Sequence, residues 1–512
     1  MAYKAYWGGM VMLKKFNTDR LEDAVKAAWR GKEKSDCVWW QGEWWSWERL
    51  DALAGDCEER LRASGFGEGQ RLAVMLPNSP MVLALSLACW RLGGSIATLN
   101  ARTGAVNLID TIRILDVNAV VLTEEGYKKS QDFDSDIPLV PTPLEGPLPL
   151  WKGRKGVPDS AETAVIFSTS GTSGLPKAVP CLHSNILSNL APIDAHVPGL
   201  LAEDGVFLNV LPNFHTFGYN MAGMIPLTFG LKQVLVPSFV PVDNTIKAIV
   251  EAKVNKIIAV PTIMAFLLGA LSKKELRLKG ITHVITGGDR LNVQMDARSK
   301  EYLGVGILEG YGLTECSPVV AVTPSMEARK LGTVGLPYPD YEIEIRDREG
   351  RPLGLHEEGV LWVKGPSVVP GYFRDEANTK DRFHDGWFNT GDVVQIDEDG
   401  YVKIVDRATD IIIVSGFNVY PQEVEAVLCA HPAVHAAVAV GEKNNVAGEL
   451  VKAFIILNEG AEATPKELMA YCRERLTHYK VPRKIGFVKE YPVSPTGKIL
   501  RRELRKMKIE KQ

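Results

Sequence analysis

The sequence lacks the features that mark secreted, membrane-spanning and nucleic-acid-binding proteins. Its seven cysteines are scattered without a CxxC pair, which indicates reduced thiols and a cytoplasmic location. The longest apolar run, residues 257–271, contains Pro261 and is too short to cross a bilayer, and the first residues do not form a signal peptide. We therefore expect no transmembrane segment, while a peripheral membrane contact stays open.

Neither sign of charge is in excess. Lysine plus arginine (59) nearly balances aspartate plus glutamate (62), so there is no global field that favours nucleic acid. One local excess exists, because residues 498–511 carry seven basic side chains against Glu503 and Glu510. We interpret this run as a solvated helix face, with a phosphate-bearing partner as the alternative.

The composition, with 46% hydrophobic and 24% charged residues, is that of a globular protein, and 512 residues allow two to four domains. Strand and helix patterns alternate over residues 71–99 and again over 233–286. This alternation predicts an α/β fold, with parallel or mixed sheets covered by helices in two subdomains.

The pattern changes after Gly332. Residues 341–346 and 360–364 read as short strands, and 393–405 as a hairpin, which predicts a small β-barrel-like subdomain. A compact α+β unit follows. We expect two domains, 1–406 and 407–512, of which the second is small and mobile.

A loop rich in hydroxyls and glycine lies between an apolar strand at 164–167 and a helical run at 184–190. Glycine lets the backbone approach an anion, hydroxyls donate hydrogen bonds, and the closing lysine adds charge. Taken alone, such a loop is a flexible linker or a phosphate-binding loop. It is not a P-loop, because the GxxxxGK[ST] spacing is absent. The residues of this loop that we predict to bind nucleotide are Thr169, Ser170, Gly171, Thr172, Ser173, Gly174 and Lys177.

The loop resembles the signature of the adenylate-forming superfamily, which includes acyl-CoA synthetases, firefly luciferase and peptide-synthetase adenylation domains. Further motifs of that superfamily follow in order, at residues 311–315, 390–392, 406–407 with 416–418, and 495–498. Five ordered motifs are far more specific than one. The resemblance covers nearly the whole chain and implies ATP, Mg²⁺ and a carboxylic acid as ligands.

The resemblance also implies roles for individual residues. Asp392 and Arg407 fit the ribose, since a carboxylate accepts from hydroxyls and a guanidinium adds a forked donor. Two segments at strand ends would flank adenine, with Tyr311 stacking on it. The residues of these two segments are Gly287, Gly288 and Asp289, and Glu309, Gly310, Tyr311 and Gly312.

Joining a carboxylate to ATP brings two anions together, so catalysis requires neutralised charge at the α-phosphate. By resemblance Lys498 is the catalytic cation that bridges the carboxylate and the α-phosphate. Glu315 would hold Mg²⁺, a hard cation that prefers carboxylate oxygen, and Thr314 would contact the α-phosphate.

His215 resembles the gate that borders the acyl pocket and the thiol channel of the superfamily. The segment that follows, 219–224, would line an acyl tunnel or form a tightly packed helix, and the sequence leaves both readings open. No acidic residue stands at the start of this segment to meet an ammonium group, which argues against an amino-acid substrate.

The second half reaction requires a thiol. The turn containing Gly416 and Asn418 resembles the loop beside the pantetheine tunnel, and the thiol belongs to coenzyme A or to the phosphopantetheine of acyl carrier protein. Two positions depart from the superfamily pattern: Ala178 replaces a glycine, and Thr409 occupies the hinge position.

The resulting prediction is an AMP-forming acid–thiol ligase that activates a fatty or similarly apolar acid and transfers it to coenzyme A. A ligase using acyl carrier protein is the alternative. A non-catalytic nucleotide-binding protein is disfavoured, because Lys498, Glu315 and Asp392 are all present.

Overall fold

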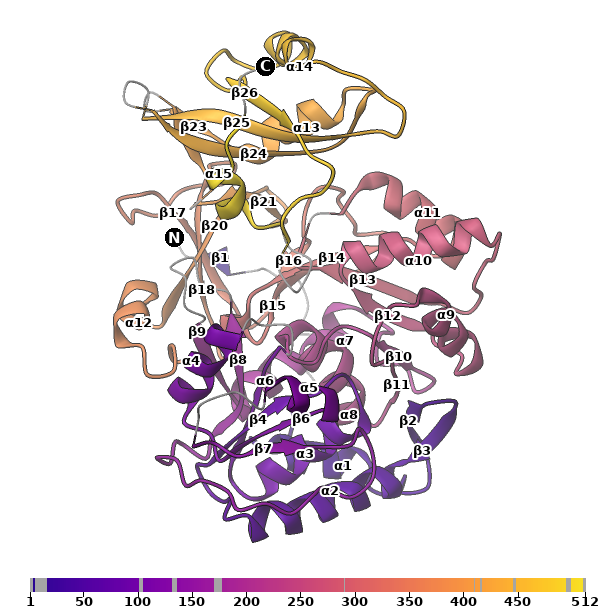
Figure 1. Cartoon of the computed structure of the whole chain (residues 1–512). Coiled ribbons are helices and arrows are strands. Elements are labelled where there is room, and N and C mark those ends of the chain that lie inside the picture. Colours follow the sequence, from indigo (N-terminus) through magenta and orange to yellow (C-terminus); the bar gives the residue numbers. More distant parts are fainter. Residues whose placement is uncertain are drawn as a thin grey trace.

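The computed structural model describes residues 3–4, 16–100, 105–130, 136–169, 177–289, 291–408, 410–414, 417–444, 448–493 and 499–509. Within these ranges the chain forms four sheets with helices around them (Figure 1). No helix in the described part has the length and apolarity that a membrane span requires. All seven cysteines are free thiols. The predicted α/β class is confirmed.

The first sheet has the strand order β7-β6-β4-β5-β8-β9 and is parallel except for β9. Its helix α3 is buried over nearly its whole length, as an all-apolar helix requires. The strands are β4 (Arg71–Met75), β5 (Ser95–Thr98), β6 (Ala119–Leu122), β7 (Leu139–Pro141), β8 (Thr163–Thr169) and β9 (Lys177–Leu182). The helices are α1 (Leu21–Ala28), α2 (Trp47–Ala63), α3 (Pro80–Arg91), α4 (Ala105–Leu115) and α5 (Glu124–Lys129).

The second sheet has the order β16-β15-β14-β13-β12-β10-β11-β2-β3 and a parallel centre. Its strands are β2 (Asp36–Trp40), β3 (Glu43–Ser46), β10 (Val206–Asn209), β11 (Lys232–Leu235), β12 (Lys256–Ala259), β13 (His283–Gly287), β14 (Leu308–Gly312), β15 (Val319–Val322) and β16 (Leu336–Pro337). Its helices are α6 (His183–Leu190), α7 (Ile193–His196), α8 (Ile225–Phe229), α9 (Val242–Glu251), α10 (Pro261–Lys273) and α11 (Val293–Leu303).

One strand of this sheet differs from the prediction. The apolar run at 305–308 predicts a strand that ends at Leu308, but β14 begins there and continues to Gly312. The strand continues because β14 pairs antiparallel with β15, which provides hydrogen-bond partners for the backbone groups at its two glycines.

The third sheet lies where the small β-barrel-like subdomain is predicted and consists of six antiparallel strands. Helix α12 (Glu376–Arg382) precedes its central hairpin, and β21 ends at Arg407, where the domain boundary is predicted. The strands are β1 (Tyr3–Lys4), β17 (Glu342–Arg346), β18 (Gly359–Lys364), β19 (Phe383–His384), β20 (Trp387–Ile396) and β21 (Val402–Arg407).

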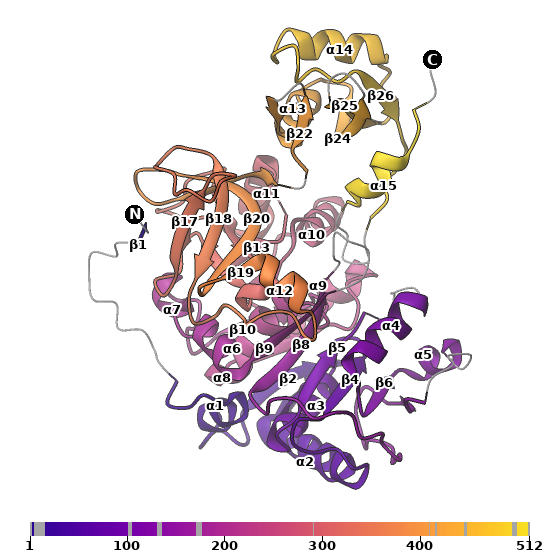
Figure 2. The same ribbon diagram turned by 90° about the vertical axis from the view of Figure 1, so that its left-hand side faces the viewer.

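The fourth sheet is built entirely from residues after 411 and stands apart from the others (Figure 2). It has its own apolar core, which includes Ile412, Leu428 and Leu468. The strands are β22 (Ile412–Val414), β23 (Phe417–Val419), β24 (Val434–Asn444), β25 (Gly448–Leu457) and β26 (Lys484–Phe487), with α13 (Pro421–Cys429), α14 (Pro465–Arg473) and α15 (Arg501–Lys506).

Candidate active site

Two of the predicted nucleotide segments lie side by side at the carboxyl ends of parallel strands. Gly287 at the end of β13 pairs in register with Gly310 of β14. A Cβ atom on Gly287 would stand 3.0 Å from the Gly310 carbonyl oxygen and 3.4 Å from the ring of Phe217. Only a glycine fits this contact without displacing its neighbours. Gly288 and Asp289 continue from the same strand end and are exposed.

A hydrogen-bonded group of three side chains forms beside these glycines. The Tyr311 hydroxyl donates to Asp392 Oδ2 at 2.6 Å, and Arg407 Nε lies 3.0 Å from Asp392 Oδ1. The hairpin register of β20 and β21 places Asp392 opposite Arg407. Burial, together with the Asp392 carboxylate, raises the pKa of Tyr311, and the same carboxylate raises the pKa of Arg407. The Asp392 carboxylate therefore lies between two donors.

A second group surrounds Glu315. The Tyr372 hydroxyl donates to Glu315 Oε1 at 2.8 Å, and Lys177 Nζ stands 4.6 Å from the centre of the Tyr372 ring. Burial and the Glu315 carboxylate raise the pKa of Tyr372. Glu315 lies in η2 (Thr314–Cys316), a short helical turn in which Thr314 is buried. Lys177 and Glu315, far apart in the sequence, thus meet around Tyr372.

His215 and the segment after it adjoin the Glu315 group. The segment forms η1 (Phe217–Met224), a π-helix that is buried from Gly218 onward. His215 Nδ1 accepts from the Phe217 backbone N–H at 3.2 Å. Asn220 Nδ2 donates to the Ser317 carbonyl at 3.2 Å, directly after η2. The helix therefore begins next to the charged groups and continues into the core.

The inner end of η1 meets a row of buried amides. Asn78 donates to Asn209 Oδ1 at 3.1 Å, Asn209 donates to Gln233 Oε1 at 2.9 Å, and Gln233 donates to the Gly223 carbonyl at 3.3 Å. A Cβ on Gly223 would lie 3.4 Å from Asn209 Nδ2, an ordinary contact. The row fixes the position of Gly223, because each buried amide is satisfied by the next.

Several predicted site residues lie outside the described residues: Ser170, Gly171, Thr172, Ser173, Gly174, Gly416, Lys498 and the hinge residue Thr409. The backbone is described at Thr169, which pairs with Lys177, and at Asn418, which pairs with Ile413. Glu309 and Gly312 are both part of β14. Their functional roles stay predictions.

Sequence reasoning missed Tyr372, although this side chain links Lys177 to Glu315. Tyr372 lies in a loop before α12 and belongs to none of the motifs used for the prediction. The sequence offers only the glycine before it, Gly371, where a Cβ would stand 2.5 Å from the Thr379 side chain in the fold.

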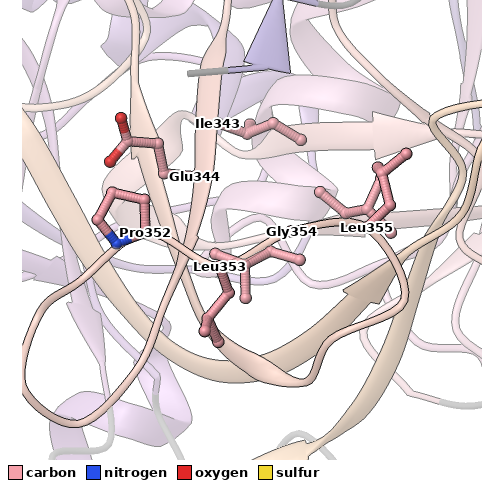
Figure 3. A pocket seen from close by; sticks show the side chains of 8 residues that line it. Ile343, Glu344, Pro352, Leu353, Gly354 and Leu355 are labelled. Carbon is pink, nitrogen blue, oxygen red and sulfur yellow. The ribbon is translucent and has the colours of Figure 1, made fainter. Parts of the chain in front are cut away.

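A pocket on the antiparallel sheet lies outside this arrangement (Figure 3). It contains none of the predicted site residues, and Glu344, its one charged lining residue, pairs with Arg346. Its lining includes Ile343, Ile345, Leu353, Leu355 and Ile396. We do not assign the reaction to it.

Comparison with known proteins identifies the class. Residues 25–373 match the family of AMP-binding enzymes, and residues 423–498 match the AMP-binding enzyme C-terminal domain. The chain belongs to this family, and the predicted adenylate-forming superfamily, with its ATP-dependent, AMP-forming ligase chemistry, is confirmed.

Three similar proteins show how far the likeness extends along the chain. A long-chain-fatty-acid–CoA ligase of Yersinia pestis is 32% identical over 499 residues, covering 90% of this chain and 88% of that protein. ATP-bound MatB from Rhodopseudomonas palustris superimposes with a TM-score of 0.85 at 27% identity, covering 95% of this chain and 98% of that one. O-succinylbenzoate coenzyme A synthetase from Bacillus subtilis, in complex with ATP and magnesium, gives 0.81 at 26% identity, covering 94% and 99%.

Proposed function

We propose that the protein activates a fatty or similarly apolar carboxylic acid as an acyl-adenylate and transfers it to coenzyme A. The observation that carries this proposal is the hydrogen bond from Asn220 of η1 to the Ser317 carbonyl, two residues after Glu315 in the chain. Charged groups suited to a nucleotide thus adjoin a buried apolar helix. The relatives named long-chain-fatty-acid–CoA ligase support the same substrate class.

The nucleotide would lie across the two charged groups. Asp392 accepts from the ribose hydroxyls and Arg407 supplies a second donor. Lys177 and Thr314 face the phosphates. Glu315 fits Mg²⁺, because it is half-buried and offers carboxylate oxygen, with one of its oxygens already oriented by Tyr372. A bound Mg²⁺ neutralises phosphate charge.

The first reaction forms one bond and breaks one. A carboxylate oxygen of the acid attacks the α-phosphorus, the bond from that phosphorus to the bridging oxygen breaks, and pyrophosphate leaves with the electron pair. Lys498 is proposed to neutralise the two reacting anions. In the second reaction the thiolate attacks the acyl carbonyl carbon, and AMP leaves.

The acid would bind along η1. Its lining is apolar at Tyr219, Met221, Ala222 and Met224, all buried. Among the described residues, η1 carries no acidic side chain that would meet an ammonium group. Both features support an apolar acid over an amino acid, and His215 stands at the mouth.

The division into domains 1–406 and 407–512 is part of the proposal. Ala408 donates its N–H to the Gly391 carbonyl at 2.9 Å, while Arg505 of α15 donates to Asp410 at 2.8 Å. Residue 408 is thus bonded to the first part and residue 410 to the second. This supports a pivot at Thr409, which would let Lys498 serve adenylation and the turn containing Gly416 and Asn418 serve thiol transfer.

The acceptor is proposed to be coenzyme A. The basic residues of α15 have carboxylate partners within the domain: Arg501 pairs with Glu425 at 2.6 Å and Lys506 with Glu503 at 3.1 Å. Such pairing leaves less charge for an acidic carrier protein or a phosphate. The relatives named long-chain-fatty-acid–CoA ligase support coenzyme A as the acceptor.

A panel of carboxylates of increasing length, with ATP and Mg²⁺, tests the proposal. Release of pyrophosphate should require an apolar acid, and mass spectrometry should then detect an acyl thioester with coenzyme A. Thioester formation on phosphopantetheinylated carrier protein alone would establish the alternative acceptor. Absence of acid-dependent pyrophosphate release would refute the proposal.

A further inference from the structure

Arg382, the last residue of α12, holds its guanidinium beside the nucleotide groups. Arg382 Nε donates to the Asn389 carbonyl at 2.7 Å, and the guanidinium stands 5.4 Å from the centre of the Phe388 ring. A Cβ on Gly391 would lie 3.2 Å from Arg382 Nη2. These contacts fix a half-buried cation next to the residue that precedes Asp392.

This cation has no acidic partner in the described part of the chain, where no carboxylate oxygen lies within the 4.0 Å that defines an ion pair. Lys380 on the same helix, by contrast, pairs with Glu376 at 3.7 Å. An arginine that is half-buried and held by one carbonyl keeps most of its five donors for another ligand.

A second cation lies close to the first. Tyr372 connects Lys177 to α12: Lys177 Nζ stands 4.6 Å from the centre of the Tyr372 ring, and the Tyr372 backbone N–H donates to Thr379 Oγ1 of α12 at 2.9 Å. Burial lowers the pKa of Lys177 and the charge of Arg382 lowers it further, against the opposing charges of Glu315, Asp375 and Asp381. Two like charges held together raise the free energy of the empty protein, and an anion between them relieves the repulsion.

We propose that Arg382 binds the terminal phosphates of ATP and the departing pyrophosphate. This inference rests on the proposed function and adds a residue to its nucleotide site. Arg382 lies near Lys177 on one side and near Gly391 and Asp392, the ribose end, on the other. A forked guanidinium suits two phosphate oxygens. As the bond to the α-phosphorus breaks, the electron pair moves to pyrophosphate, and a cation there stabilises that charge.

The test compares three nucleotide ligands by calorimetry on the full chain: α,β-methylene-ATP with Mg²⁺, pyrophosphate with Mg²⁺, and AMP. Arg382→Ala should weaken the first two by about tenfold or more, as expected for a lost charge-assisted hydrogen bond. AMP binding should stay within twofold, because AMP has no terminal phosphates. Arg382→Lys, which keeps the charge, should give an intermediate loss.

Lys380→Ala is the matched control, two residues earlier on the same helix and therefore on a different face, and should change none of the three affinities. Thermal unfolding of each variant shows whether α12 stays folded. Equal weakening of AMP and pyrophosphate by Arg382→Ala would overturn the inference in favour of a structural role, and unchanged pyrophosphate binding would overturn it outright. A wild-type chain that binds none of the ligands would instead refute the proposed function.

Discussion

The two halves of the proposed site, one for the nucleotide and one for the acyl chain, are held together by different forces. In the nucleotide half, Asp392 lies between the Tyr311 hydroxyl and the Arg407 guanidinium, and Glu315 accepts from Tyr372. In the acyl half, η1 is buried, and its polar contacts are neutral amides such as Asn209 and Gln233. The charged half depends on particular donor and acceptor groups, whereas the acyl half depends on the shape and volume of its packed side chains.

This difference determines how each half responds to change. A charged hydrogen bond contributes about 1.5–3 kcal/mol and cannot be replaced by a residue of similar size alone. Apolar packing tolerates exchange of volume but discriminates ligands by length. Substitutions in the nucleotide half should therefore impair every acid equally, and substitutions in the acyl half should impair some acids more than others.

The largest effect is expected from Lys498→Ala. Loss of the cation at the reacting phosphate should slow adenylation by about 10²–10³-fold, by analogy with removal of a preorganised donor to a developing charge. Single-turnover pyrophosphate release measures this step. Thioester formation from supplied acyl-adenylate should survive, and equal loss of both half reactions would contradict a role confined to the first.

A smaller effect is expected from Asp392→Asn. The substitution removes the carboxylate that holds Arg407 and accepts from Tyr311, so the KM for ATP should rise roughly 10–100-fold. Tyr311→Phe removes one hydrogen bond and should raise the KM for ATP less than Asp392→Asn does. An unchanged KM in Asp392→Asn would exclude the ribose role.

Substitution of Gly223 should change acid preference. A tryptophan there would fill space beside Asn209 and shift activity toward shorter acids, by roughly 1–3 kcal/mol per methylene-sized change. Gly223→Ala is the control and should have little effect, because its Cβ makes an ordinary contact. Proportional loss for long and short acids would show that Gly223 does not line the acyl site.

The smallest effect on activity, but a clear one on stability, concerns two buried histidines. Burial lowers the pKa of His183 to about 3 and that of His196 to about 4. Both bind a proton more readily when unfolded, so stability is retained above pH 6.5 and lost as the pH falls below it. Between pH 6.5 and pH 5, each histidine should lower the free energy of unfolding by about 2 kcal/mol.

Urea unfolding midpoints across pH 5–8 measure that dependence. His183→Gln should flatten the slope below pH 6.5, and substitution of the exposed His435 should leave it unchanged. A wild-type midpoint that is constant from pH 8 to pH 5 would contradict the lowered pKa values of His183 and His196.

Sequence reasoning predicted the parts of the site that depend on local pattern. The alternating pattern placed the segments at 287–289 and 309–312 after strands, and the resemblance supplied their role at adenine. The pairing of Gly287 with Gly310 is seen only in the folded sheet. The motifs supplied Asp392, Arg407 and Glu315. It did not predict Tyr372 or Arg382, whose positions depend on how a loop and α12 pack against β9 and β20.

The row of buried amides also could not be predicted from local sequence patterns. Asn78, Asn209 and Gln233 come from three separate segments, and only the folded sheet brings them to Gly223. The extent of β14 was mispredicted for a similar reason, since its last residues are strand only because β15 pairs with them.

The division of the site into a charged half and an apolar half is tested most directly by acid-dependent exchange of labelled pyrophosphate into ATP, which requires only the first half reaction. Wild type, Asp392→Asn and Gly223→Trp would be compared over acids of increasing length. We predict exchange by wild type only when an apolar acid is present, a uniform loss in Asp392→Asn, and a loss confined to longer acids in Gly223→Trp. Uniform loss in both variants would contradict the division.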